Sequence, residues 1–104
     1  MNDTSLEYDS DVITKDSIDV KEPRLYHVIL YNDHYTTMDF VVFVLETIFH
    51  HPRPISEKIM LDVHEKGKGI AGTYPRDIAE TKALQTRSLA KEHNFPLKCV
   101  AEPA

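Results

Sequence analysis

The sequence predicts an α+β domain with the element order β-α-α-β-α-β, in which a three-stranded antiparallel sheet packs against three helices on one face. Three observations predict this class. Segments of strand composition and segments of helical periodicity follow one another in that order. Glycine and proline separate them. The part of the chain with this pattern is roughly 80 residues long, which is enough for one small core.

Residues 1–24 differ in composition from the rest of the chain. They hold seven acidic and three basic residues, and therefore carry −4 of the net charge of −5. Because they show no apolar period, we expect a disordered acidic N-terminal extension. The segment also lacks the basic and apolar regions of a signal peptide. The domain itself is expected to span residues 25–104.

The first strand is predicted at Leu25–Tyr31, which is rich in β-branched and aromatic residues. The polar residues 32–34 then form a turn. Thr36 or Thr37 caps a helix that runs from Met38 to about His50. This helix is apolar nearly all round, which indicates a central helix between the sheet and the other helices.

Pro52 and Pro54 are expected to stop the first helix. A second helix is predicted from about Ile55 to Lys66, with Gly67 as its C-terminal cap. Its apolar face consists of Ile55, Ile59, Met60 and Val63.

The second half of the domain contains the remaining three elements. Gly69–Tyr74 reads as a strand with close backbone approach. Pro75 opens a helix from about Arg76 to His93, which ends at Asn94 and Pro96. Leu97–Ala101 alternates and forms the third strand. The helix carries a stripe of small residues that allows close packing: Ala79, Ala83, Thr86 and Ala90.

Composition excludes several classes of function. The acidic balance argues against a nucleic-acid partner, and no apolar run approaches the ~18 residues of a membrane span. The single Cys99 excludes an internal disulfide and is predicted to be a buried structural thiol. We expect a soluble, monomeric, cytoplasmic protein.

Motifs for catalysis or metal binding are absent from the sequence. The six histidines fit no zinc signature, so we expect no metal and no cofactor. Gly67-x-Gly69-x-x-Gly72 follows a helix and enters a strand, which is the reverse of a dinucleotide-binding context. A small hydrolase that uses Asp33 and His64 is disfavoured because no activated nucleophile lies near them in sequence. The protein is therefore expected not to be an enzyme.

One turn stands out as a candidate binding site. Asn32-Asp33-His34 is ordinary turn composition when taken alone. Met38 and Val41 follow it one helical turn apart, however, and His64 follows Met60 and Val63 at the same kind of spacing. If the two helices are neighbours, these residues form an apolar pocket with one polar rim.

Several motifs together resemble the ClpS adaptors, which recruit proteins with certain N-terminal residues (N-degrons) to a ring-shaped AAA+ unfoldase-protease. The resemblance covers roughly residues 25–100, and that family shares the predicted β-α-α-β-α-β order. The motifs that carry it are Val28–Val41, Met60–His64, Gly67–Gly72, Ala79–Lys82 and Pro96–Cys99.

The resemblance implies a role for each candidate residue. Asn32, Asp33, His34 and His64 correspond to the groups that hold the substrate's free α-amino group, which needs hydrogen-bond acceptors. The pocket for the first side chain (Leu, Phe, Tyr or Trp) corresponds to Thr36, Met38, Val41, Met60, Val63 and Leu97. Met38 corresponds to a gate against β-branched residues. Thioethers suit a pocket that accepts several apolar side chains.

The resemblance also implies a partner, the N-terminal domain of a ClpA-like or ClpC-like ATPase, which would bind Asp77, Glu80 and Lys82. Two positions depart from the family pattern. His34 stands where the family usually has a second acid, and Asp77 stands where it has a longer glutamate. The alternative hypothesis is a general protein-interaction module like the C-terminal domain of the ribosomal stalk protein, which lacks the amine-binding turn.

Overall fold

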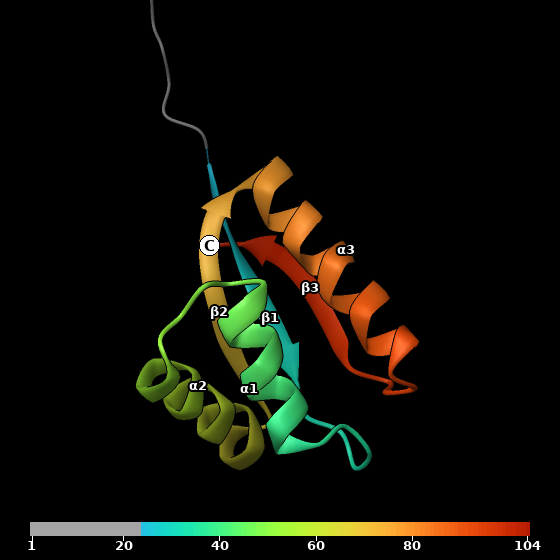
Figure 1. Cartoon of the computed structure of the whole chain (residues 1–104). Coiled ribbons are helices and arrows are strands. Elements are labelled where there is room, and N and C mark those ends of the chain that lie inside the picture. Colours follow the sequence, from blue (N-terminus) through green and yellow to red (C-terminus); the bar gives the residue numbers. More distant parts are fainter. Residues whose placement is uncertain (1–23) are drawn as a thin grey trace, which may run out of the picture.

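The computed structural model describes residues 24–104, so the expected disorder of the acidic extension lies almost wholly outside the described residues. The predicted element order is confirmed (Figure 1). The elements are β1 (Leu25–Tyr31), α1 (Met38–Thr47), α2 (Arg53–Lys66), β2 (Lys68–Pro75), α3 (Arg76–Glu92) and β3 (Lys98–Pro103).

The sheet has the order β2-β1-β3, and both pairings of the central strand β1 are antiparallel. Leu30 lies opposite Gly69 on β2 and Cys99 on β3. The β1–β2 register shifts between Val28 and Ile29, which leaves Ala71 as an extra residue on β2. The Ala71 carbonyl at this bulge lies 2.5 Å from the ring nitrogen Nε2 of His51, so the loop between α1 and α2 is attached to the sheet.

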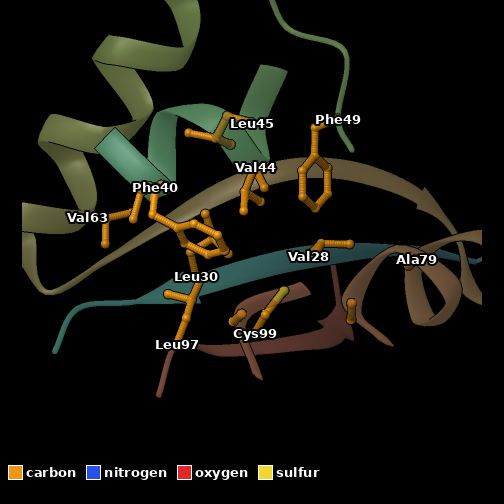
Figure 2. Close-up of a cluster of buried hydrophobic side chains, with 14 residues drawn as sticks. Val28, Leu30, Phe40, Val44, Leu45, Phe49, Val63, Ala79, Leu97 and Cys99 are labelled. Atoms are coloured by element: carbon orange, nitrogen blue, oxygen red, sulfur yellow. The ribbon is translucent and has the colours of Figure 1, made fainter. Parts of the chain in front are cut away.

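The three helices cover one face of this sheet, with α1 between α2 and α3 (Figure 1). In the core, Val44 of α1 points toward β1, which carries Val28 and Leu30, and Leu45 belongs to the same buried cluster (Figure 2). All four are fully buried. The small residues predicted to form the packing face of α3 are buried as well, namely Ala79, Ala83, Thr86 and Ala90. Their size explains how α3 lies close against β3 and β1.

The interpretation of α1 as a central helix whose apolar side chains are buried needs correction at two positions. Met38 is 43% exposed and Phe43 is 44% exposed. Phe43 is partly covered by the ring of His93, whose centroid is 6.5 Å away. The exposed position of Met38 is explained by its place in the first turn of the helix, beside the loop that follows β1.

The boundaries between α1 and α2 also differ from the prediction. α1 ends at Thr47, before either proline, and His50 adopts a left-handed φ of 58°. Pro54 lies in the first turn of α2 instead of ending α1. Proline is tolerated there because the first N–H groups of a helix have no intrahelical partner. Ile55 is consequently 46% exposed, and Ser56 takes its place on the buried face.

The cap of α1 is Thr37, whose hydroxyl accepts a hydrogen bond from the Phe40 N–H at 3.1 Å. Thr36, the other predicted cap, is engaged elsewhere. On β3 the prediction of a buried structural thiol is confirmed, because Cys99 is fully buried. Burial raises the pKa of the Cys99 thiol to about 11. The thiolate form is therefore scarce at neutral pH, and Cys99 is unreactive.

Within residues 24–104, no helix has both the length and the apolar character that crossing a membrane requires.

Candidate functional site

A cavity of about 250 Å³ lies where the loop after β1, the start of α1 and the end of α2 meet. Nine of the ten residues predicted to hold the amine or the first side chain line it. The residues that line the cavity are Asn32, Asp33, His34, Thr36, Met38, Val41, Met60, Val63 and His64. The two helices are neighbours, and polar and apolar residues from three segments therefore lie together around the cavity.

The turn after β1 is joined to the end of α2 by a backbone contact. The Asn32 N–H donates to the Gly67 carbonyl at 2.9 Å. Gly67 ends α2 with a left-handed φ of 90°, which glycine adopts without steric cost. His64 lies one turn before Gly67, so this contact brings its imidazole to the same rim as Asn32.

The carboxylate of Asp33 orders the loop on which the site is built. One oxygen, Oδ1, accepts hydrogen bonds from the N–H of Tyr35 at 2.8 Å and of Thr36 at 2.7 Å. The other, Oδ2, accepts from the Thr36 hydroxyl at 2.7 Å. A carboxylate has about four lone-pair sites, so Oδ2 retains one for a ligand. Asp33 is therefore foremost a positioning group that also brings a negative charge to the rim.

These contacts change the acidity of Asp33. Burial by itself favours the neutral carboxyl group and raises its pKa. The hydrogen bonds donated by Thr36 and Tyr35, together with the charge of His34, outweigh burial and lower the pKa of Asp33 below its ordinary value. The rim therefore carries a carboxylate throughout the neutral range.

The opposite walls of the cavity are apolar. Val41 and Val63 are buried and form its inner part, whereas Met38 and Met60 lie nearer the surface. An apolar side chain in this cavity would pack against valines and flexible thioethers. The rim would offer acceptors to a donor or cation carried next to that side chain.

Leu97, the tenth predicted residue, is not among the side chains that line the cavity, and its place in the pocket stays a prediction. It is 5% exposed and belongs to the hydrophobic core, next to Leu30 (Figure 2). The residue lies immediately before β3, which is on the far side of β1 from β2 and α2. Its place in the sheet order therefore puts it in the core, to which Val41 and Val63 of the cavity wall also belong.

The two acids predicted to contact a protein partner lie together at the start of α3. Asp77 and Glu80 line a shallow cavity of about 540 Å³ with Arg24, Tyr26, Pro75 and Arg76. Glu80 accepts a hydrogen bond from Arg76 Nε at 3.3 Å. The surface therefore presents acids and arginines side by side, at the opposite end of β1 from the first cavity.

Lys82, the third residue of the predicted partner surface, has a structural contact that the sequence does not reveal. Its Nζ donates to the Ile48 carbonyl at the end of α1, at 2.8 Å. The same nitrogen lies 5.8 Å from the ring centroid of Phe49 and 5.4 Å from that of Tyr74. Lys82 thus joins α3, α1 and the end of β2, and it is half-buried instead of fully solvated.

Replacing Lys82 with methionine is expected to lower the free energy of unfolding by roughly 1–2 kcal/mol, because the Ile48 carbonyl loses a charged donor while the side-chain volume is kept. Lys91→Met, at an exposed position of the same helix, is the matched control and should change stability by less than about 0.5 kcal/mol. Urea denaturation of both variants measures the difference. Equal stabilities would show that the Lys82 contact contributes nothing.

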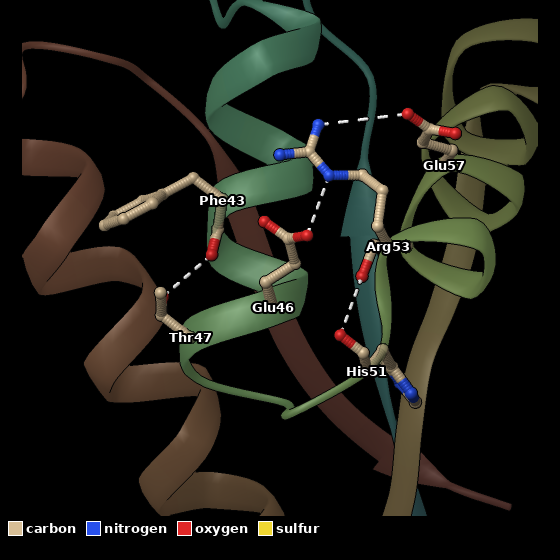
Figure 3. A network of polar contacts seen from close by, with 7 residues as sticks. Phe43, Glu46, Thr47, His51, Arg53 and Glu57 are labelled. Atoms are coloured by element: carbon tan, nitrogen blue, oxygen red, sulfur yellow. Dashed lines mark hydrogen bonds and ion pairs between the residues drawn. The ribbon is translucent and has the colours of Figure 1, made fainter.

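Polar contacts of Arg53 also join α1 and α2, at the ends of the two helices that lie away from the cavity. Arg53 Nε donates to Glu46 of α1 at 2.8 Å, and its guanidinium lies 3.8 Å from Glu57 on the next turn of α2 (Figure 3). Arg53 is well exposed, so each ion pair contributes little, about 0–1 kcal/mol.

No group of three or more histidine, cysteine or acidic side chains in residues 24–104 is arranged to hold a metal ion. The contact of the Asn32 N–H with the Gly67 carbonyl was not predicted from the sequence, and neither were the four residues that line the second cavity beside the two acids, namely Arg24, Tyr26, Pro75 and Arg76. For Arg76, the spacing of four residues to Glu80 is a signal that could have indicated the ion pair. The Gly67 contact has no such signal, because it is made by backbone atoms 35 residues apart in the chain.

Known proteins match this chain over most of its length. Residues 21–100 match the family model described as ATP-dependent Clp protease adaptor protein ClpS. The ATP-dependent Clp protease adapter protein ClpS of Syntrophus aciditrophicus (strain SB) is 58% identical over 80 residues, which are 77% of this chain and 75% of the relative. The protein of the same name from Acetivibrio thermocellus is 52% identical over 87 residues, 84% of this chain and 88% of the relative.

A solved structure has the same fold. The structure of Agrobacterium tumefaciens ClpS2 bound to L-phenylalaninamide superposes with a TM-score of 0.77 and 40% sequence identity. The match covers 80% of this chain and all of that chain.

Proposed function

The chain belongs to the ClpS family of adaptor proteins of the ATP-dependent Clp protease, and from this premise we propose that it is a cytoplasmic adaptor for N-degron substrates. In this role it binds the free N-terminal residue of a substrate, with Leu, Phe, Tyr or Trp in first position. It then delivers the substrate to a Clp-type AAA+ unfoldase-protease. The adaptor performs no chemical step itself.

The observation that carries this proposal is the composition of the 250 Å³ cavity, which combines a polar rim with apolar walls. A free N-terminal residue has two matching parts, an α-ammonium group that donates hydrogen bonds and a side chain next to it. L-phenylalaninamide, the ligand bound to the similar Agrobacterium protein, has both parts and little else.

We assign the ammonium group to the rim residues Asn32, His34 and His64, with Asp33 supplying negative charge and one free lone-pair site. The amide oxygen and the neutral imidazoles are acceptors for N–H donors. The first side chain enters between α1 and α2, where Thr36, Met38, Val41, Met60 and Val63 form the wall.

We assign the surface at the start of α3 to the N-terminal domain of a ClpA-like or ClpC-like ATPase. Asp77 and Glu80 offer acceptors for a basic partner, and Lys82 supports them by holding α3 against α1. This surface is separate from the cavity, so substrate and ATPase can bind together. One copy of the chain contains both surfaces, which is consistent with a monomeric adaptor.

Binding of peptides that differ only in the first residue tests the proposal. Peptides that start with Leu, Phe, Tyr or Trp should bind, and one that starts with Gly should not, because it places no side chain in the cavity. A general protein-interaction module would bind all of them alike or none. Fluorescence anisotropy with a label at the C-terminal end of the peptide measures this directly.

His34 is expected to make peptide binding sensitive to pH. A histidine accepts a hydrogen bond from the ammonium group while it is neutral and repels the group once it is protonated, and histidine side chains change charge between about pH 5 and pH 8. His64 on the facing helix has the same constraint, whereas Asp33 keeps its negative charge over this range because its pKa is lowered. Affinity should therefore fall as the pH drops from about 8 to about 6.

The variant His34→Asp should bind a Phe-starting peptide more tightly by roughly 0.5–1.5 kcal/mol, because it adds a charge-assisted contact at an exposed site. Its affinity should also change less between the two pH values. Titration of both proteins at both pH values measures the two effects. If the peptide affinity of His34→Asp depends on pH as steeply as that of the parent protein, His34 points away from the ligand.

A further inference from the structure

Gly69 lies directly behind one wall of the cavity, although it does not line the cavity itself. It is on β2 opposite Leu30, in the strand that α2 covers. A Cβ atom at Gly69 would stand 2.9 Å from Cγ2 of Val63, and 3.4 and 3.5 Å from the Ile59 carbonyl oxygen and the Val63 nitrogen. Carbon atoms pack best at about 3.5–4.0 Å, so there is no room for a methyl group.

Val63 transmits this constraint to the cavity. It is 2% exposed, it lines the cavity, and it lies between Gly69 and the space for a ligand side chain. Valine in a helix has one strongly preferred χ1 rotamer, so the side chain cannot readily turn aside. The backbone of α2 is close as well, and therefore a larger residue at position 69 displaces Val63, α2 or both.

We propose that Gly69 is a specificity-determining residue that acts through Val63 and sets the depth of the side-chain pocket. The absence of a side chain at Gly69 lets α2 approach β2 closely, and this keeps Val63 back from the cavity. The inference deepens the proposed N-degron function and rests on it. It concerns which first residues fit, and not whether an amine is bound.

The variant Gly69→Ala tests this proposal with two peptides that are identical beyond the first residue, one starting with Phe and one with Leu. A shallower pocket excludes the larger ring more than the smaller branched chain. We expect the ratio of the two affinities, Phe over Leu, to fall roughly tenfold, the scale on which one methylene group in an apolar pocket changes discrimination.

Gly72→Ala is the matched control on the same strand. A Cβ at Gly72 would stand 2.6 Å from Cε2 of Tyr74, and Tyr74 does not line the cavity. Both variants are expected to be less stable than the parent protein because both are overpacked. Only Gly69→Ala should change the ratio, so the control separates loss of stability from loss of pocket depth.

A pair of compensating substitutions, one that removes methyl groups at Val63 and one that adds a methyl group at Gly69, provides the second test. Val63→Ala removes the methyl group that Gly69→Ala would strike, so Val63→Ala alone should deepen the pocket and raise the Phe over Leu ratio. Adding Gly69→Ala to it should fill the space and return the ratio toward that of the parent protein. This double variant also decides the question if Gly69→Ala alone does not fold.

Two outcomes would overturn the inference. In the first, Gly69→Ala folds and its ratio of Phe-peptide to Leu-peptide affinity equals that of the parent protein. In the second, the Val63→Ala, Gly69→Ala double variant has the same ratio as Val63→Ala alone. Failure of the proposed function has a different signature, because the parent protein itself would then bind Phe- and Gly-starting peptides equally. The parent titration is therefore done first.

Discussion

Acetylation of the α-amino group of a Phe-starting peptide is expected to weaken its binding by roughly 2–4 kcal/mol, which corresponds to about 30- to 700-fold in Kd. The acetylated nitrogen keeps one N–H but loses its charge and its other donors. The acceptors on Asn32 and His64 are then covered by the peptide without being satisfied, and the charge of Asp33 has no counterpart.

The control for this measurement uses the same chemical change at another place. A peptide with one internal lysine can be acetylated at that lysine while its N-terminus stays free. This should leave the affinity nearly unchanged, because the polar rim is assigned to the α-ammonium group and not to a lysine further along the peptide. Equal losses from both modifications, or no loss from either, would contradict the assignment of the polar rim to the α-ammonium group.

The second large effect is expected for Asp33→Ala, which should weaken peptide binding by about 2 kcal/mol, the scale of one hydrogen bond to a charged group. The change removes the acceptor of the Tyr35 and Thr36 N–H groups and of the Thr36 hydroxyl, so the loop loses its order. It also removes the negative charge from the rim.

Asp33→Asn separates these two contributions. An amide oxygen can still accept from the loop N–H groups, but it brings no charge. The variant should therefore bind the peptide with an affinity between those of the parent protein and of Asp33→Ala. Isothermal titration of the three proteins with one Phe-starting peptide gives the comparison. If both variants bind like the parent, Asp33 neither orders the site nor attracts the ligand.

The lowered pKa of Asp33 also fixes the sign of its effect on folding stability. A carboxyl group that is more acidic in the folded state stabilises the fold at pH values above its unfolded pKa, near 3.9. This stabilisation is lost as the pH falls through the lower folded value. Urea denaturation between about pH 5 and pH 2 should thus show a smaller acid-induced loss for Asp33→Asn than for the parent protein.

The order and type of the elements were determined by the sequence alone, because they depend on local patterns. The β-branched run Leu25–Tyr31 became β1 with the predicted boundaries. Alternation and small-residue spacing likewise identified β3 and the buried face of α3. The boundary between α1 and α2 was less predictable, because Pro54 is compatible both with ending one helix and with starting the next.

The apolar half of the candidate site was also predictable, because residues one helical turn apart share a face. Met38 and Val41 on α1, and Met60 and Val63 on α2, line one cavity for this reason. Their function was not visible in the spacing. The assignment of Asn32 and His64 to an amine came from the resemblance to a family.

Only the tertiary structure decided which groups are free to bind and which are occupied. Lys82 reads as a solvated charge in sequence, but it bonds to Ile48, 34 residues away. Leu97 was assigned to the pocket by the resemblance alone, and the sheet order places it in the core. The strand at Gly69 was predicted to have a close backbone approach, but only the packing of α2 on β2 identifies Val63 as the neighbour. Periodicity carries no information on such contacts, because they depend on how closely whole elements approach one another.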